Sequence, residues 1–170
     1  MRSIMAMVRP RRPDAAALYA ALVAEARAPG WFLDGGVADD QDGRFAVLSS
    51  VVALGILRLE NGGEEAARAS VALTEAFIAD MDSQMRQEGF GDPSLGKQVR
   101  HMVGALANRV DIWRRTLAED AGWDESVAET IHRGVETDEA ARTFAAESMR
   151  RLHETLDGAD DPAVMRGRWR

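Results

Sequence analysis

Residues 91–97 (GDPSLGK) have the spacing of a phosphate-binding loop, with a glycine, four residues, a second glycine and a lysine. Such a loop follows a strand and continues into a serine or threonine that holds magnesium. Here the run follows a predicted helix, and the lysine is followed by Gln98. Pro93 also removes one of the backbone N–H groups that would hold phosphate. The run is more typical of a turn in which Asp92 caps the next helix and Pro93 opens it. We therefore predict no nucleotide binding here.

Three aspartates within residues 39–42 precede Gly43 and resemble part of a calcium-binding loop. When the loop is aligned on Gly43, its first and last ligands fall on Ala38 and Ser49, which have no carboxylate. A calcium site is therefore not expected. The aspartates are better explained as capping the helix that follows, whose dipole favours Asp42, and as partners for an arginine elsewhere in the fold.

Asp80 and Asp82 lie two residues apart on another predicted helix. At about 100° per residue they point roughly 160° away from each other, so they cannot share a metal ion or a proton. Asp82 and Arg86 are instead expected to form an ion pair between residues four apart. Asp80 lies at the edge of the apolar face, and we expect it to be partly buried and paired.

The histidine and cysteine content gives no support for a catalytic or metal centre. His101, His132 and His153 lie on separate predicted helices without a second ligand at metal spacing, and a single helical histidine is usually a surface residue. The chain has no cysteine, which excludes disulfides and thiolate-based zinc, iron–sulfur and redox sites. We therefore expect no catalytic residue, no metal and no cofactor.

The composition predicts one α-helical domain with an acidic surface. A chain of 170 residues with 46% hydrophobic residues can bury a core of its own. Alanine is abundant, and β-branched and aromatic residues are sparse, which favours helix over sheet. The net charge of −7 repels nucleic acid, so a general nucleic-acid binder is not expected.

Arginines concentrate at both ends of the chain. The ends carry Arg2, Arg9, Arg11, Arg12, Arg166, Arg168 and Arg170. We expect a basic tail at residues 1–12, a helical domain at 13–157 and a polar, flexible tail at 158–170. Solvated tails are the usual outcome, and the alternative is contact with a ribosome or an anionic membrane.

No segment predicts secretion or a membrane span. The first residues lack the apolar run of a secretion signal, and the most apolar stretch, residues 45–59, is shorter than the roughly 20 residues that cross a bilayer. We therefore expect a cytoplasmic location, with peripheral contact with the inner membrane as an option.

Hydrophobic periodicity predicts a bundle of about six helices. They cover residues 14–27, 44–59, 64–88, 93–118, 124–133 and 138–156. The second is apolar on every side, which is typical of a buried helix, so we place it at the centre. The fourth has the clearest amphipathic stripe, from Leu95 to Leu117. Between the first two helices lies a polar loop, residues 30–43, which begins with Trp31, Phe32 and Leu33 and is expected to pack this aromatic anchor into the core.

Three sequence blocks resemble the bacterial branch of the ubiquinol–cytochrome c chaperone family. The blocks are residues 37–45 (VADDQDGRF), residues 75–82 with 85–92 (EAFIADMD and MRQEGFGD), and residues 96–102 (GKQVRHM). They reproduce, in order, the family's Asp-Gly-Arg-Phe turn, its Asp-Met-Asp helix and its Gly-x-Gly-Asp turn leading to Gly-Lys. The resemblance runs from about residue 20 to residue 117.

The chain departs from the family pattern at three places. Relatives often have Leu-His where Ser49 and Ser50 stand, and Phe-Tyr-Gly-Arg where residues 106–109 read LANR. An Arg-Asn pair common in relatives is Arg133-Gly134 here.

The resemblance implies an all-helical, non-enzymatic assembly factor for the cytochrome bc1 complex. Mitochondrial relatives help cytochrome b to mature, with a helper protein and near the ribosome, so a maturing subunit such as cytochrome b is the expected partner. Two other interpretations remain open: a helical adaptor with an unrelated client, and an enzyme that uses the aspartate-rich loop with Arg44 and Lys97.

The motif residues concentrate at predicted helix ends, around two glycine turns. One turn includes Gly43 and opens the second helix, and the other includes Gly89 and Gly91, between the third and fourth helices. Because loops carry function more often than packed helix faces do, we expect these ends to form one protein-binding surface. Its candidate residues are Asp39, Asp42, Arg44, Arg86, Glu88, Asp92 and Lys97.

Overall fold

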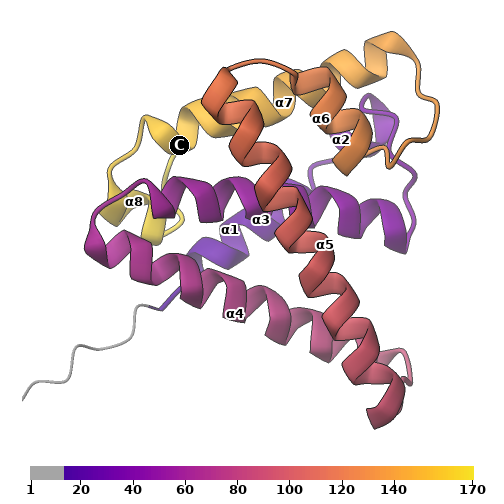
Figure 1. Ribbon diagram of the computed structural model, residues 1–170. Coiled ribbons are helices and arrows are strands. Elements are labelled where there is room, and N and C mark those ends of the chain that lie inside the picture. Colours follow the sequence, from indigo (N-terminus) through magenta and orange to yellow (C-terminus); the bar gives the residue numbers. More distant parts are fainter. Residues whose placement is uncertain (1–13) are drawn as a thin grey trace, which may run out of the picture.

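The computed structural model describes residues 14–170, apart from the side chains of Asp92 and Pro93, and every regular element within them is a helix (Figure 1). The helices are α1 (Ala16–Ala26), α2 (Gly30–Leu33), α3 (Gln41–Glu60), α4 (Glu64–Gln87), α5 (Asp92–Glu119), α6 (Trp123–Thr130), α7 (Glu139–Asp157) and α8 (Asp161–Met165). The predicted all-α fold is confirmed. The six predicted helices correspond to α1 and α3 to α7, whereas α2 and α8 are short helices in segments predicted to be loops.

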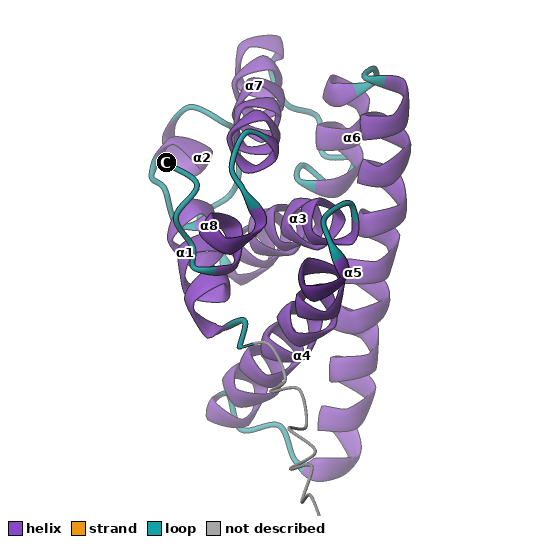
Figure 2. Ribbon diagram, turned by 90° about the vertical axis from the view of Figure 1, so that its left-hand side faces the viewer, coloured by secondary structure: helices purple, strands orange, loops and turns teal. Residues whose placement is uncertain are grey.

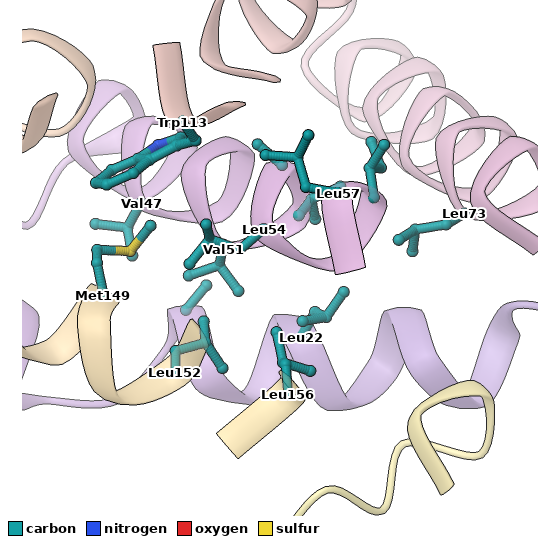
Figure 3. Packing of buried hydrophobic residues seen from close by; sticks show 14 of the residues in the cluster. Leu22, Val47, Val51, Leu54, Leu57, Leu73, Trp113, Met149, Leu152 and Leu156 are labelled. Carbon is teal, nitrogen blue, oxygen red and sulfur yellow. The ribbon is translucent and has the colours of Figure 1, made fainter. Parts of the chain in front are cut away.

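The central position predicted for α3 is confirmed. Helices α1, α4, α5 and α7 lie on different sides of it (Figure 2). In close-up, Val51 and Leu54 of α3 point toward side chains of the surrounding helices, among them Leu22 of α1 and Leu152 of α7 (Figure 3). Because so much apolar surface is removed from water on every side of α3, this helix contributes much of the hydrophobic stabilisation.

Two buried serines in α3 satisfy their hydroxyl groups within the helix. Ser49 donates a hydrogen bond to the carbonyl oxygen of Phe45, and Ser50 donates one to that of Ala46. A buried hydroxyl group with no partner would cost roughly 1–3 kcal/mol. The backbone carbonyls one turn earlier remove this cost, so the polar pair is tolerated in the core.

The aspartate-rich loop caps α3, as predicted, and the capping residue is Asp40. Its Oδ1 accepts a hydrogen bond from the backbone N–H of Gly43 at 2.7 Å, and Asp42 lies in the first turn. Gly43 is required here, because a Cβ atom would lie 2.0 Å from the carbonyl oxygen of Ala38. This packing starts α3 at Gln41, three residues before the predicted start at residue 44.

The loop between α1 and α3 is anchored by Trp31, as predicted. The Trp31 side chain is buried, and its Nε1 donates to the carbonyl oxygen of Glu25 at 3.0 Å. Because one turn of helix, α2, carries Trp31, the anchored loop is partly helical rather than irregular as predicted.

Helix α5 confirms the predicted stripe, because Leu95, Leu106 and Trp113 are all buried. Its start differs by one residue from the prediction: the helix begins at Asp92, and Gly91 takes the N-cap position. The segment with phosphate-loop spacing therefore consists of a turn after one helix and the first turns of the next.

Residues 158–170 pack against the domain rather than forming the expected flexible tail. Val164 of α8 is fully buried and Trp169 is 8% exposed. The chain reverses at Gly167, whose φ is +70° and whose backbone approaches α1 so closely that a Cβ atom would lie 2.7 Å from the Ala17 carbonyl oxygen. No helix among residues 14–170 is long and apolar enough to cross a membrane.

Candidate functional site

The start of α3 presents an exposed ion pair. The Arg44 Nε atom lies 2.8 Å from Asp39 Oδ1, and both side chains are more than half exposed. The hydrogen bond that Arg44 donates to Asp39, together with the charge of Asp39, raises the pKa of Arg44 above its ordinary value. Exposed pairs of this kind contribute little to stability, so these charges remain available for contacts with a partner.

The two glycine turns meet, because a hydrogen bond connects the helix ends beside them. Gln41 Nε2 at the start of α3 donates to Oε1 of Glu88, just after α4, at 2.7 Å. Phe90, in the turn between α4 and α5, is 37% exposed. The aspartate-rich loop and the α4–α5 turn therefore lie side by side, although 47 residues separate Gln41 from Glu88.

Three other candidate residues lie around the α4–α5 turn. Arg86 Nε contacts Asp82 Oδ2 at 2.8 Å, which confirms the pair predicted within α4. Lys97 is exposed on α5 and has no hydrogen-bond or ion-pair partner in the described part of the chain. Asp92 begins α5, and its side chain is outside the described residues.

A third turn, after α6, joins this region through Arg133. Its Nη1 lies 3.2 Å from Asp42 Oδ2 at the start of α3. Arg133 has a φ of +57°, in the left-handed region that residues other than glycine rarely adopt. In the sequence, Arg133 stands out only as part of a departure from the family pattern, and it was not among the predicted site residues.

Arg109 of α5 contacts Phe45 of α3 and Thr130 at the end of α6, and it was not among the residues predicted for the site. The residue is 8% exposed, and its guanidinium lies 5.7 Å from the centre of the Phe45 ring. Burial, together with the charge of Arg133, lowers the pKa of Arg109 to about 10. A signal existed in the sequence, because position 109 falls between Leu106 and Trp113 on the apolar stripe, where a charged residue is unusual.

His132 is buried, contrary to the surface position expected for helical histidines. Its Nε2 lies 2.8 Å from the carbonyl oxygen of Gly35, and its Nδ1 is buried without a hydrogen-bond partner. The residue lines a cavity of about 300 Å³ between the loop before α3 and the turn after α6. His132 follows the end of α6 and so does not lie on an exposed helix face. Its contact with Gly35 holds these two segments together.

Asp80 is half-buried and paired, as predicted. Tyr19 of α1 donates a hydrogen bond from its hydroxyl group to Asp80 Oδ2 at 2.6 Å, and burial raises the pKa of this tyrosine. Among residues 14–170, no three histidine, aspartate or glutamate side chains are grouped so that they could hold a metal ion.

The fold defines an all-α bundle built around one buried helix, with its sequence motifs at two neighbouring turns that a third turn joins through Arg133. The chain belongs to the ubiquinol–cytochrome c chaperone family, because the family model described as ubiquinol-cytochrome C chaperone matches residues 33–170. This match begins later than the resemblance of the motifs and includes the region after residue 117, which the motifs do not reach.

One solved structure is similar in fold, the crystal structure of the Cbp3 homolog from Brucella abortus. The two chains are 21% identical, and the TM-score is 0.75 over 89% of this chain and 84% of that one. At this identity the likeness establishes the shared fold alone. A comparison with curated proteins found no match.

Proposed function

We propose that this protein is a chaperone for assembly of the cytochrome bc1 complex, and that it binds maturing cytochrome b. The observation that carries the proposal is the family match over residues 33–170. The solved relative with the same fold is named as a Cbp3 homolog. We propose that the protein acts by binding and not by catalysis, and a helper protein is a further candidate partner.

The binding surface in this proposal is the group of charged residues at the three turns, which are exposed wherever the structure describes their side chains. It comprises Asp39, Asp42, Arg44, Arg86, Glu88, Asp92, Lys97 and Arg133, and we call it the three-turn surface. Its ion pairs are exposed and therefore weakly held, so a partner can exchange them for pairs of its own. Phe90 adds an exposed aromatic ring beside them.

We also propose that the protein works at the inner face of the membrane, where cytochrome b is inserted. Arg166 and Arg168 are exposed and flank Gly167, whose backbone lies against Ala17 in the first turn of α1, whereas Arg170 pairs with Glu25 in the last turn of α1. The basic segment of residues 1–12 leads into this same helix. Clusters of basic residues favour contact with anionic lipid, and a ribosomal surface is the alternative.

The test of this function is deletion of the gene. We expect the deletion strain, if it has no paralogue, to contain less assembled cytochrome bc1 complex and to have lower quinol–cytochrome c activity. Expression of the wild-type chain should restore both, and crosslinking in that strain should join it to cytochrome b. Normal levels of assembled complex in the deletion strain would rule the function out.

A further inference from the structure

Arg109 is a buried cation without a carboxylate partner. Its side chain forms no ion pair within the described part of the chain, although the residue is only 8% exposed. A buried charge that lacks a partner costs several kcal/mol in real proteins. The fold therefore keeps an unfavourable group at this position, and only part of that cost is offset by the contacts described next.

The guanidinium has unused hydrogen-bonding capacity. Of its five N–H groups, one on Nη1 donates to the Ala105 carbonyl oxygen at 3.2 Å and one on Nη2 donates to the Thr130 carbonyl oxygen at 2.7 Å. The Nε atom is buried and has no partner. The ring of Phe45 covers the group at 5.7 Å and contributes a cation–π contact. These contacts fix the orientation of the guanidinium but do not neutralise it.

Arg133 lies three residues after Thr130, whose carbonyl oxygen accepts a hydrogen bond from Arg109, and burial together with the positive charge of Arg133 disfavours the charged form of Arg109. The Arg133 backbone lies in the left-handed region at a φ of +57°, and such strain is concentrated at functional sites. The Arg133 side chain is held by Asp42, whose own side chain is 77% exposed. Because this ion pair is exposed, it can open at little cost. Two residues further on, Val135 is a large apolar side chain that is 64% exposed.

We propose that Arg109 and Arg133 together receive one carboxylate from a protein partner, an aspartate or glutamate whose apolar neighbour packs on Val135. An arginine fork fits a carboxylate through two parallel hydrogen bonds, and a partner carboxylate would offset both positive charges. The three aspartates of residues 39–42 lie close by and repel a polyanion such as RNA more strongly than a single carboxylate. This inference rests on the proposed chaperone function, because it names the chemistry of the client.

The decisive variant is Arg133→Glu, which supplies a carboxylate to Arg109 from within the chain. The melting temperature should change little, because the attraction gained with Arg109 is opposed by repulsion from Asp42, which pairs with Arg133 in the wild type. Capture of cytochrome b by crosslinking in membranes should fall at least tenfold, because the binding position is now filled. Arg109→Gln removes the buried charge, and we expect near-normal melting with a similar loss of capture. The matched control is Arg68→Glu, at an exposed position on α4, which should behave as wild type.

A second measurement identifies the partner group. In Arg133→Lys, a carbodiimide should couple the new amine to an aspartate or glutamate of captured cytochrome b. Capture at the wild-type level by both Arg133→Glu and Arg109→Gln would overturn the site and leave the chaperone function intact. So would unfolding of both variants, because it would show that the two arginines serve the fold. If the wild-type chain captures no bc1 subunit, the chaperone function and the carboxylate site both fall.

Discussion

Two largely buried arginines show how differently the same side chain is used in this protein. Arg58 of α3 is fully engaged: it donates to the Leu156 and Ala159 carbonyl oxygens at 2.9 and 2.6 Å, and to Asp161 at 2.8 Å. Arg109 has two carbonyl partners and no carboxylate. A paired buried arginine offsets the cost of its desolvation, whereas an unpaired one leaves an uncompensated charge that weakens the fold.

We predict that Arg58→Ala lowers the free energy of unfolding by about 2–3 kcal/mol, because Asp161 and two carbonyl groups lose a charged donor. For a chain of this size the melting temperature should fall by roughly 5–10 °C. Arg68→Ala removes an exposed pair on α4 and should change melting by no more than about 2 °C. Thermal melts of the two variants beside wild type test this, and equal melting of both would contradict it.

Because Arg58 pairs with Asp161, the loss of stability in Arg58→Ala should depend on pH. Hydrogen bonds from the Gly63 backbone N–H and from Arg58 lower the pKa of Asp161. A lowered pKa means that the stabilisation is present above the ordinary aspartate pKa of about 3.9 and is lost as the pH falls through the folded-state value. The difference between wild type and Arg58→Ala should therefore be constant near neutral pH and shrink in acid, as melts at several pH values would show.

At the scale of elements, the burial of α3 is the feature on which the bundle depends. Leu54 is 1% exposed at its centre. We predict that Leu54→Asp unfolds the protein or lowers its melting temperature by more than 10 °C, because an unpaired buried charge costs several kcal/mol.

The matched control for that change is Val71→Asp on α4. Val71 is 60% exposed, so a carboxylate there remains hydrated, and melting should stay within about 2 °C of wild type. Circular dichroism melts of both variants make the measurement. Melting of Leu54→Asp close to that of wild type would show that α3 is not buried in solution.

The long helices could be predicted from the sequence because their apolar residues recur with the helical period. Helix α8 could not, because five residues give no usable period and its stability depends on distant contacts. Its Asp161 is held by Arg58, and the segment that follows it is fixed by burial of Trp169. The local pattern of charged residues therefore predicted a flexible tail at residues 158–170. In the folded chain this segment packs against α1 and α3.

At the scale of the whole molecule, the candidate surface is a product of how helix ends meet. The sequence placed Asp39, Arg44 and Glu88 at helix ends, because glycine turns and capping residues are local signals. It could not show that these ends are neighbours, since the Gln41–Glu88 and Asp42–Arg133 contacts depend on the packing of α3, α4 and α6. Arg109 remained hidden for the same reason: its missing carboxylate is visible only once the bundle is assembled.

The last prediction separates a recognition surface from a network that only fixes loops. Arg44→Ala, Arg86→Ala and Lys97→Ala are made singly in the full chain. We expect melting to change by no more than about 2 °C in each case, because all three side chains are exposed. Capture of cytochrome b should fall severalfold, and the loss should be greatest at low salt, because exposed charges at an interface mainly set the association rate and are screened by ions.

A structural network would give the opposite pattern. If these residues lock the turns, their loss should lower the free energy of unfolding by about 3 kcal/mol or more, as for a broken buried pair, with capture per folded molecule unchanged. Arg68→Ala on α4 serves again as the control, since its ion pair with Glu64 is exposed and is not part of the three-turn surface. Large losses of stability with full capture would therefore refute the recognition role, because the two outcomes differ in both quantities measured.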